Sequence, residues 1–261
     1  MGFRVKQYTI QSNKVTNQIR MAFLSDLHLT EHGAGNDNLI REIDQLELDI
    51  ILIGGDMVIG REDCTTAVAE ELLAKLTRKH PVWYALGNHE ERLKEKVDRF
   101  GDTYEWYRRR LLSMGVQLLD NTYQNIEVKG NALSIYGLSL PLDYFKRFVR
   151  KKLPLEEINE LLGKPDETCF QLLLAHHPRY AETYFEWGAD LVLSGHIHGG
   201  VMRLGKQPVI SPDFQLFPKY GYGKFEKGNQ CLLISGGLGE HTIPFRLFNP
   251  KELVLVDIIS K

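Results

Sequence analysis

The stretch IRMAFLSDLHL, residues 19–29, joins an apolar run to an acid and an imidazole. Its first six residues are mostly apolar and predict a buried β-strand. Asp26 and His28 follow at the point where the strand gives way to a loop. Because a two-residue step on an extended segment places alternate side chains on the same side, these two groups form a geometrically sensible pair of metal donors.

Five further apolar runs have the same character and end at Gly, Asp, Asn, His or Pro. They are LDIILIG (48–54), PVWYALG (81–87), ALSIYGL (132–138), FQLLLA (170–175) and ADLVLS (189–194). Helical patterns fall between several of them, at 38–46, 66–79, 104–115 and 179–188. Strands that alternate with helices of this length predict largely parallel pairing with helices packed outside. After residue 200 the pattern is all strand, which predicts a mixed α/β sandwich with a β-rich C-terminal end.

The length and composition are those of an ordinary globular protein. A chain of 261 residues with 43% hydrophobic and 25% charged residues predicts one domain over residues 1–261. The formal net charge of -2 offers no general attraction to nucleic acid, so no nucleic-acid partner is expected. The three cysteines lie far apart and predict neither a disulfide framework nor a thiolate zinc site.

The sequence also bears on cellular location. No apolar stretch approaches the roughly 20 residues that span a bilayer, so no transmembrane segment is expected. The first 14 residues are too polar for a signal peptide. We therefore expect a cytoplasmic location, with peripheral attachment to a membrane, or an anchor that precedes this sequence, as the alternatives. No feature of the sequence indicates an oligomeric state.

Two segments carry predictions of their own. Residues 139–166 contain a basic cluster and then an amphipathic helix that starts near Pro154, and they interrupt two core strands. We expect this insertion to form a lid. In the helical pattern at 104–115 we expect Trp106, Leu111 and Leu112 to be buried while the arginines stay in water.

Five of the predicted strands end in groups that can bind metal. The residues are Asp26, His28, Asp56, Asn88, His89, His176, His177, His196 and His198. In open α/β sheets, ligands bind outside the carboxyl ends of the strands, so these groups are expected on one rim. Carboxylates and neutral imidazoles are good ligands for Zn²⁺, Mn²⁺ or Fe²⁺, and a carboxylate can bridge two cations.

A charge count indicates which substrate such a site attracts. Two divalent cations bring +4, Asp26 and Asp56 return -2 and a bridging hydroxide -1, which leaves about +1 in a confined site. That centre attracts an anionic phosphate. Metal also lowers the pKa of bound water to about 7, and two ions roughly 3.5–4 Å apart can hold the attacking and leaving oxygens in line.

The order of the motifs carries a family resemblance. The series D-x-H (26–28), GD (55–56), GNHE (87–90), AHHP (175–178) and GHIH (195–198) resembles the calcineurin-like metallophosphoesterase family. The stretches DLVLSGHIHGG (190–200) and GLGEHTIPFRLFNPKELVL (237–255) are similar to its bacterial YkuE-like branch. The resemblance implies a four-layer αββα sandwich of two mixed sheets flanked by helices.

The same resemblance implies roles for individual residues. It places Asp26, His28 and His198 on one metal ion, places Asn88, His176 and His196 on a second, and makes Asp56 the bridge. His89 would stabilise the transition state or protonate the leaving oxygen. The implied reaction is attack by a metal-bridging hydroxide on a phosphomonoester, a phosphodiester or a pyrophosphate. The substrate would be a small molecule or a lipid-linked nucleotide.

Weaker candidates and alternatives complete the prediction. His177, His241 and Arg203 are candidate substrate contacts, and Arg246 is a further one. The other interpretation of both arginines is that each is an exposed partner for a carboxylate.

Two alternative functions stay open. A metal-dependent nuclease would need a basic groove with stacking aromatics. A non-catalytic scaffold that keeps the fold is the second alternative, and the intact set of seven ligand positions argues against it.

Overall fold

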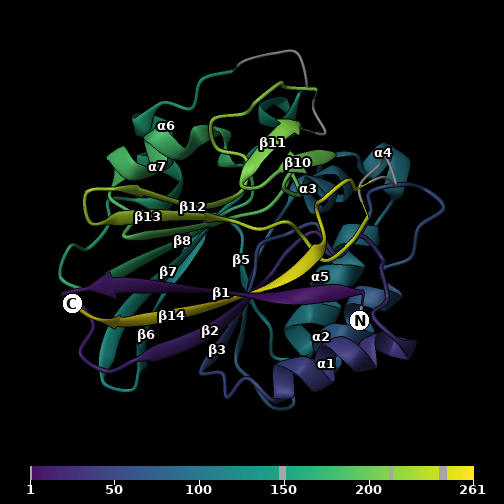
Figure 1. Ribbon diagram of the computed structural model, residues 1–261. Helices are drawn as coiled ribbons and strands as arrows, with labels where there is room; N and C mark the ends of the chain where they lie inside the picture. Colours follow the sequence, from purple (N-terminus) through teal and green to yellow (C-terminus); the bar gives the residue numbers. More distant parts are fainter. Residues whose placement is uncertain (1, 147–150, 212–213, 241–245) are drawn as a thin grey trace.

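The computed structural model describes residues 2–146, 151–211, 214–240 and 246–261, and most of its strands form two six-stranded sheets (Figure 1). The first sheet has the order β1-β14-β2-β3-β4-β5. Its strands are β1 (Phe3–Ser12), β14 (Lys251–Ser260), β2 (Ile19–Leu24), β3 (Ile50–Ile53), β4 (Val82–Ala85) and β5 (Gln117–Leu119). All neighbours are parallel except β14 and β2, so the sheet is mixed.

The second sheet has the order β12-β13-β9-β8-β7-β6. Its strands are β12 (Gly223–Lys227), β13 (Gln230–Ile234), β9 (Leu191–Ser194), β8 (Phe170–Ala175), β7 (Asn131–Leu138) and β6 (Thr122–Val128). The four central strands are parallel, and the two edge strands are antiparallel to their neighbours. A separate hairpin of β10 (Met202–Leu204) and β11 (Gln207–Ile210) lies outside both sheets.

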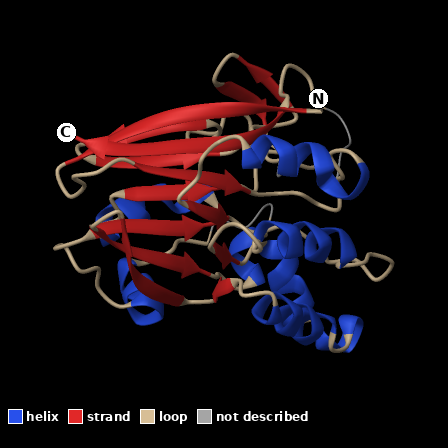
Figure 2. Cartoon of the chain, turned by 90° about the horizontal axis from the view of Figure 1, so that it is seen from below, coloured by secondary structure: helices blue, strands red, loops and turns tan. Residues whose placement is uncertain are grey.

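Helices cover the outer faces of the two sheets. The α-helices are α1 (Asp37–Asp44), α2 (Ala67–Leu76), α3 (Asn88–Glu95), α4 (Val97–Phe100), α5 (Thr103–Ser113), α6 (Leu155–Leu162) and α7 (Ala181–Trp187). Three single 3-10 turns are η1 (Ala34–Asn36), η2 (Leu142–Phe145) and η3 (Pro178–Tyr180). Helices α1, α2 and α5 lie on one side of the sheets and α6 and α7 on the other, outside the strands (Figures 1 and 2).

Three apolar cores fill the spaces between these four layers. Strand β2 shows how period-2 alternation serves two cores at once: Ala22 and Leu24 pack toward the helices, and Met21 and Phe23 pack toward the other sheet. The third core lies between the second sheet and helices α6 and α7. The predicted αββα sandwich is therefore confirmed.

The structure differs from the sequence prediction at α5. Trp106 is 67% exposed and Leu112 is 45% exposed, whereas Tyr104, Tyr107 and Leu111 are buried. The prediction that Trp106 and Leu112 are buried is wrong. The buried residues follow a spacing of three and four, so the tyrosine rings, and not the tryptophan, face the sheet.

The predicted insertion at 139–166 contributes to the outer layer of the second sheet. Tyr144, Ile158 and Leu162 belong to the core beneath α6. The helix begins after Pro154 as the sequence indicates, although no side chain caps it. Residues 147–150 of the basic cluster lie outside the described residues, so the lid stays a prediction.

The register of both sheets brings strand ends together. Leu24 pairs with Ile53, and Ile53 pairs with Tyr84, so the loops after β2, β3 and β4 start side by side. In the second sheet Ser194 pairs with Ile234, and β8 is the neighbour of β9. Across the ranges that the structure describes, no helix is both long enough and apolar enough to cross a bilayer.

Candidate metal centre

The loops after these strands hold a group of polar residues in left-handed backbone. Asp26 (φ 53), His28 (φ 46), Asp56 (φ 54), His196 (φ 67) and His198 (φ 49) all adopt this conformation. For an L-residue it costs about 1–2 kcal/mol, and such strain is concentrated at functional sites. Five of the seven predicted ligands share it, so the loops here are shaped for a purpose other than stability.

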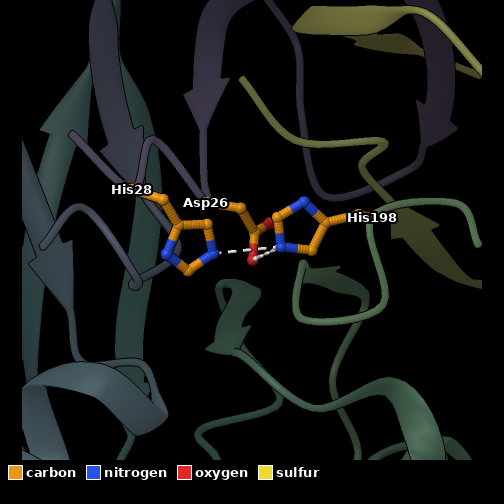
Figure 3. A group of neighbouring side chains, drawn as sticks. All are labelled: Asp26, His28 and His198. Carbon is orange, nitrogen blue, oxygen red and sulfur yellow. Dashed lines mark hydrogen bonds and ion pairs between the residues drawn. The ribbon is translucent and has the colours of Figure 1, made fainter. Parts of the chain in front are cut away.

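One cluster joins Asp26, His28 and His198, and the two histidines lie 170 residues apart in the sequence (Figure 3). The Nε2 atoms of the two histidines are 3.0 Å apart, and His198 Nε2 is 3.4 Å from Asp26 Oδ1. Two donor atoms that share one ion at about 2.1 Å lie roughly 3–3.5 Å from each other. The spacing therefore suits a single cation.

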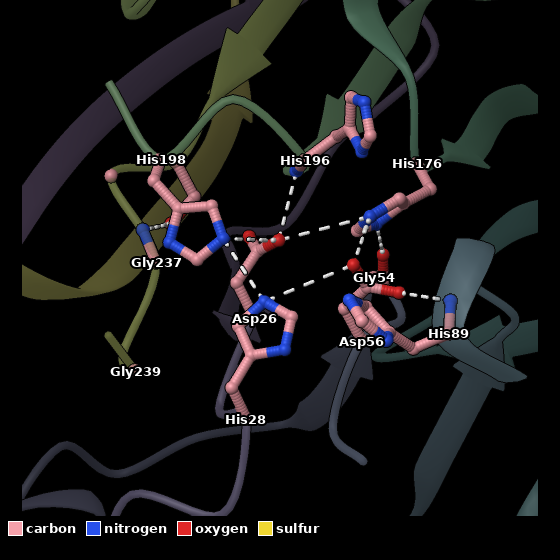
Figure 4. A network of polar contacts seen from close by, with 12 residues as sticks. Asp26, His28, Gly54, Asp56, His89, His176, His196, His198, Gly237 and Gly239 are labelled. Atoms are coloured by element: carbon pink, nitrogen blue, oxygen red, sulfur yellow. Dashed lines mark hydrogen bonds and ion pairs between the residues drawn. The ribbon is translucent and has the colours of Figure 1, made fainter. Parts of the chain in front are cut away.

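A second cluster joins Asp56, His176 and His196 (Figure 4). His176 Nε2 is 3.1 Å from Asp56 Oδ2 and 3.7 Å from Asp26 Oδ1. Asp56 also approaches the first cluster, because His28 Nε2 lies 3.9 Å from its Oδ2 atom. The Asp56 carboxylate thus stands between the two clusters, as the predicted bridging role requires.

The position of His176 between two carboxylates favours a positive charge at its Nε2 atom. Its Nδ1 donates to the Gly54 carbonyl at 2.6 Å, so its Nε2 faces the two carboxylates. Burial disfavours the charged ring, but the carboxylates of Asp56 and Asp26 outweigh burial and raise the pKa of His176 to about 10. A neutral ring would turn a lone pair toward Asp56, so this position calls for a cation, either a proton or a metal ion.

Both acids of the site are buried. Burial, with the nearby Asp56 charge, raises the pKa of Asp26 to about 6. Burial opposes ionisation of Asp56 as well, but His176 and His89 hold the pKa of that carboxyl well below its usual range. Asp26 Oδ2 and Asn88 Oδ1 are buried without a hydrogen-bond partner. Buried anionic oxygens and aimed imidazoles form a donor set that fits divalent cations.

Asn88 and His89 open helix α3 directly beside Asp56. The His89 amide donates to Asp56 Oδ1 at 2.8 Å. The Gly60 amide donates to His89 Nδ1 at 2.9 Å, so the neutral His89 ring carries its proton on Nε2. Burial lowers the pKa of His89. The ring is therefore prepared to donate a hydrogen bond from Nε2.

Glu90 is a site residue that the sequence prediction missed. Its fully buried carboxylate accepts from the amides of Asp56 (2.8 Å), Met57 (2.9 Å) and Gly87 (3.0 Å) and from Tyr84 Oη (2.6 Å). One side chain thereby ties the loop after β3 to the loop after β4. The fourth letter of GNHE is the signal that could have identified it.

Arg246 lies beside a carboxylate, as one interpretation of the sequence expects, since its Nε is 3.9 Å from Glu240 Oε2, and it also contacts the site. Its guanidinium is 8% exposed, donates to the Gly236 carbonyl at 2.7 Å and lies 2.9 Å from His198 Nδ1. A guanidinium can only donate, so the neutral His198 ring carries its proton on Nε2, toward His28. Binding of an ion through His198 Nε2 therefore requires Arg246 to give up this hydrogen bond.

Two of the candidate substrate residues, His177 and Arg203, are buried. His177 is 3% exposed, and its ring packs against those of Phe145 (5.4 Å between centroids) and His196 (4.2 Å). It borders a small cleft of about 70 Å³. Arg203 is buried and stacks on the Tyr222 ring at 3.4 Å, so the interpretation as an exposed ion-pair partner is wrong for it. His241 lies outside the described residues.

Comparisons with known proteins agree with the motif series. The model of the calcineurin-like phosphoesterase family matches residues 19–200. An uncharacterised metallophosphoesterase from Helicobacter pylori is 28% identical over 99% of this chain and 64% of its own length. The metallophosphoesterase YkuE from Bacillus subtilis is 23% identical over 97% of this chain and 85% of its own. The chain thus spans less than two thirds of the Helicobacter relative.

A comparison with a solved structure bears on the fold only. The NAD nucleotidase of Haemophilus influenzae has a TM-score of 0.51 and 15% identity, over 84% of this chain and 45% of its own. This likeness agrees with the four-layer sandwich described above.

Proposed function

The chain belongs to the calcineurin-like phosphoesterase family, and from this premise we propose that it hydrolyses phosphoester bonds with the help of two divalent metal ions. The observation that carries the proposal is the pair of donor clusters that meet at Asp56. Each cluster offers imidazole and carboxylate atoms within 4.8 Å of one another.

The proposal assigns the ligands by cluster. Asp26, His28 and His198 would hold one ion, Asn88, His176 and His196 the other, and Asp56 both. Oxygen and nitrogen donors of this kind suit Mn²⁺, Zn²⁺ or iron, and the donor set does not choose among them. When bound, such ions supply an activated water as nucleophile and neutralise charge on the phosphoryl oxygens.

The protein's own groups would do the remaining work. His89 would donate from Nε2 to the phosphoryl group or to the leaving oxygen, because its Nδ1 is occupied by the Gly60 amide. Glu90 would keep Asp56 and Asn88 in register through the two loops that it ties together. The two carboxylates offset only half of the +4 brought by two ions, so an anionic phosphate would be attracted.

We propose a mono- or diester or a pyrophosphate as the substrate, and residues 139–166 as a lid beside it. Phe145, at the end of η2, lies 5.2 Å from the His196 ring and 5.4 Å from the His177 ring, measured between centroids. A segment in contact with a proposed ligand is well positioned to control access to it.

The test combines metal content with turnover. Elemental analysis of the purified protein should find close to two metal ions per chain. Bis-p-nitrophenyl phosphate or p-nitrophenyl phosphate should be hydrolysed, and the ratio of the two rates indicates diester or monoester preference. His80 lies outside the strand-end motifs. The variant His80→Gln is therefore the control for substitutions of the site histidines and should keep both metal and activity.

The alternatives give different results in the same experiment. Folded protein without metal and without turnover would support a non-catalytic scaffold. Tight, steeply salt-dependent DNA binding with DNA cleavage would support a nuclease.

A further inference from the structure

The two donor clusters differ in how their histidines are prepared for an ion. In the second cluster His176 donates its Nδ1 proton to the Gly54 carbonyl at 2.6 Å, so the neutral ring has its lone pair on Nε2. In the first cluster His198 Nδ1 accepts from the Arg246 guanidinium at 2.9 Å, so the neutral ring has its proton on Nε2. One ring therefore offers a lone pair to an ion, and the other offers a proton.

The proton of His198 lies where the first ion is proposed to bind. His198 Nε2 is 3.0 Å from His28 Nε2 and 3.4 Å from Asp26 Oδ1. Both of these atoms can accept, so this proton links the donor atoms of the cluster. An ion that binds His198 through Nε2 must displace the proton. The neutral ring then carries a proton on Nδ1, where it faces a guanidinium that cannot accept it.

Further hydrogen bonds hold Arg246 in this place. Its Nη1 donates to the Gly236 carbonyl at 2.7 Å, and its Nη2 donates to the Gly239 carbonyl at 2.5 Å. Both carbonyls lie in the same turn as Gly237, which lies beside His198 (Figure 4), so close that a Cβ atom on it would be 3.2 Å from Nδ1. A movement that separates the guanidinium from His198 therefore also disturbs its bonds to the turn.

The positive charge of Arg246 acts on the first cluster with little screening. The side chain is 8% exposed, and its Nε is 3.9 Å from Glu240 Oε2. That carboxylate is 47% exposed and lies closer to Lys251 Nζ, at 2.7 Å. A buried cation repels a nearby divalent ion more strongly than a solvated cation does, because less water lies between the charges. The charge and the hydrogen bond of Arg246 thus both oppose an ion at His198.

We propose that Arg246 competes with the ion of the first cluster for His198 and makes this ion the weaker and more readily exchanged of the two. The inference rests on the proposed function, which requires both ions. Arg246 is then a positioning residue that acts through His198. The second cluster would keep its ion, because the His176 ring is already oriented for it. Occupancy of the first cluster, and with it turnover, would follow the supply of metal.

Other roles of Arg246 make different predictions. If the guanidinium only ties the turn to the metal loops, its removal lowers the free energy of unfolding and tightens the binding of neither ion. If it only contacts the substrate, its removal raises KM and leaves the affinity for metal unchanged. The affinity of each ion is therefore the quantity that separates the three roles.

The test measures Mn²⁺ binding to the whole chain, treated beforehand with a chelator, by isothermal titration calorimetry. The wild type should bind two ions in two steps of different affinity. Arg246→Gln should tighten the weaker step by about tenfold or more, because the positive charge is gone and the Gln carbonyl can accept from Nδ1. Arg246→Lys keeps the charge and can only donate, so its affinities should stay within about threefold of wild type.

Second substitutions assign the affected step to a cluster. In a His176→Asn background, which keeps the first cluster, Arg246→Gln should still tighten binding. In a His28→Asn background, which disrupts the first cluster, it should have no effect. Lys251→Gln is the matched control, because it removes the same charge from beside the same Glu240 carboxylate. It should leave both binding steps unchanged. Urea unfolding shows that each variant is folded before its titration is interpreted.

Three results would overturn the inference. They are an Arg246→Gln variant that binds neither ion more tightly, an Arg246→Lys variant that tightens binding as much as Arg246→Gln, and an effect that persists in the His28→Asn background. Wild-type protein that binds no Mn²⁺ would overturn the proposed function and this inference with it. Two bound ions whose affinities do not respond to Arg246→Gln would overturn this inference alone.

Discussion

The two sheets bring different chemistry to one site. The loops after β2, β3 and β4 carry Asp26, Asp56 and Asn88, so the first sheet supplies every oxygen donor of the predicted set. The loops after β8 and β9 carry His176, His196 and His198 from the second sheet. The negative charge of the predicted ligands therefore comes from one sheet, and the other contributes imidazoles. Neither sheet alone carries all the ligands of the proposed two-metal centre.

Hydrogen bonds join the two halves of the site, that is, the residues contributed by the first sheet and those contributed by the second. The His176 ring donates to the Gly54 carbonyl, and the His196 amide donates to Asp26 Oδ1 at 2.9 Å. Each bond crosses from one sheet to the other. The first sheet thus supplies the negative charge of the site, and the second sheet supplies hydrogen bonds that hold Gly54 and Asp26.

The largest effect is expected from removal of charge in the first half. Asp56→Asn should reduce turnover of bis-p-nitrophenyl phosphate by at least about 10³-fold and lower the bound metal, because the bridging donor loses its charge. His176→Asn, its counterpart in the second half, should lose one ion and less activity. Stopped assays and elemental analysis on both variants provide the comparison. Equal losses would show that charge does not distinguish the halves.

A smaller loss is expected from a residue that touches no proposed ion. His89→Ala should reduce turnover by roughly 10²–10⁴-fold, since general acid or hydrogen-bond donation is lost, while both ions stay bound. Turnover and metal content measured on the same preparation check this. Loss of metal with activity would mean that His89 belongs among the ligands, as its place in a cluster with His28 and Asp56 allows.

Glu90→Gln tests how strongly the loops of the first half depend on one acceptor. The amide can no longer accept at both ends, so one or more of the amide donors loses its partner, and the free energy of unfolding should fall by about 1–3 kcal/mol. Turnover should fall about tenfold with KM little changed. Urea unfolding and steady-state kinetics measure the two effects. Unchanged stability would contradict the role of Glu90 as the tie between the loops.

Glu91→Gln is the matched control, one residue further along α3. Burial raises the pKa of Glu91 to about 7, against the effect of Lys94. The raised pKa means that the folded state binds the proton more tightly, so Glu91 weakens stability as pH rises from about 4.5 to 7. The variant should therefore be more stable than wild type by about 1–2 kcal/mol at pH 8, with little difference at pH 4. Thermal unfolding at both pH values tests this sign, and activity should not change.

Much of the fold could be predicted from local pattern. The β2, β3, β4, β8 and β9 strands stand where the apolar runs predicted them, because a buried strand of four to six apolar residues has a distinct signature. The apolar runs do not predict strand β1, because it lies at the edge of its sheet and carries exposed polar side chains, including Arg4 and Gln7. The sequence does not predict helix α3, because Asn88 and His89 follow the apolar run 81–87 directly and resemble the end of that strand.

The candidate site could also be predicted from the sequence only in part. The residue types and their order placed Asp26, Asp56 and the histidines at strand ends, and the structure brings six of the seven predicted ligands into two clusters. Asn88 lies at the start of α3 with a buried Oδ1. The roles of Glu90 and Arg246 did not follow from sequence, because each depends on partners brought together by folding.

By itself the sequence determined the strand-and-helix rhythm, the donor types and the family, since these depend on spacing along the chain. Only the tertiary structure decided which donors face each other, which backbones are left-handed and which aromatic residues stay exposed. His28 and His198 approach to 3.0 Å across 170 residues because two sheets pack through a shared apolar core. Periodicity describes the faces of an element, and packing alone decides what those faces meet.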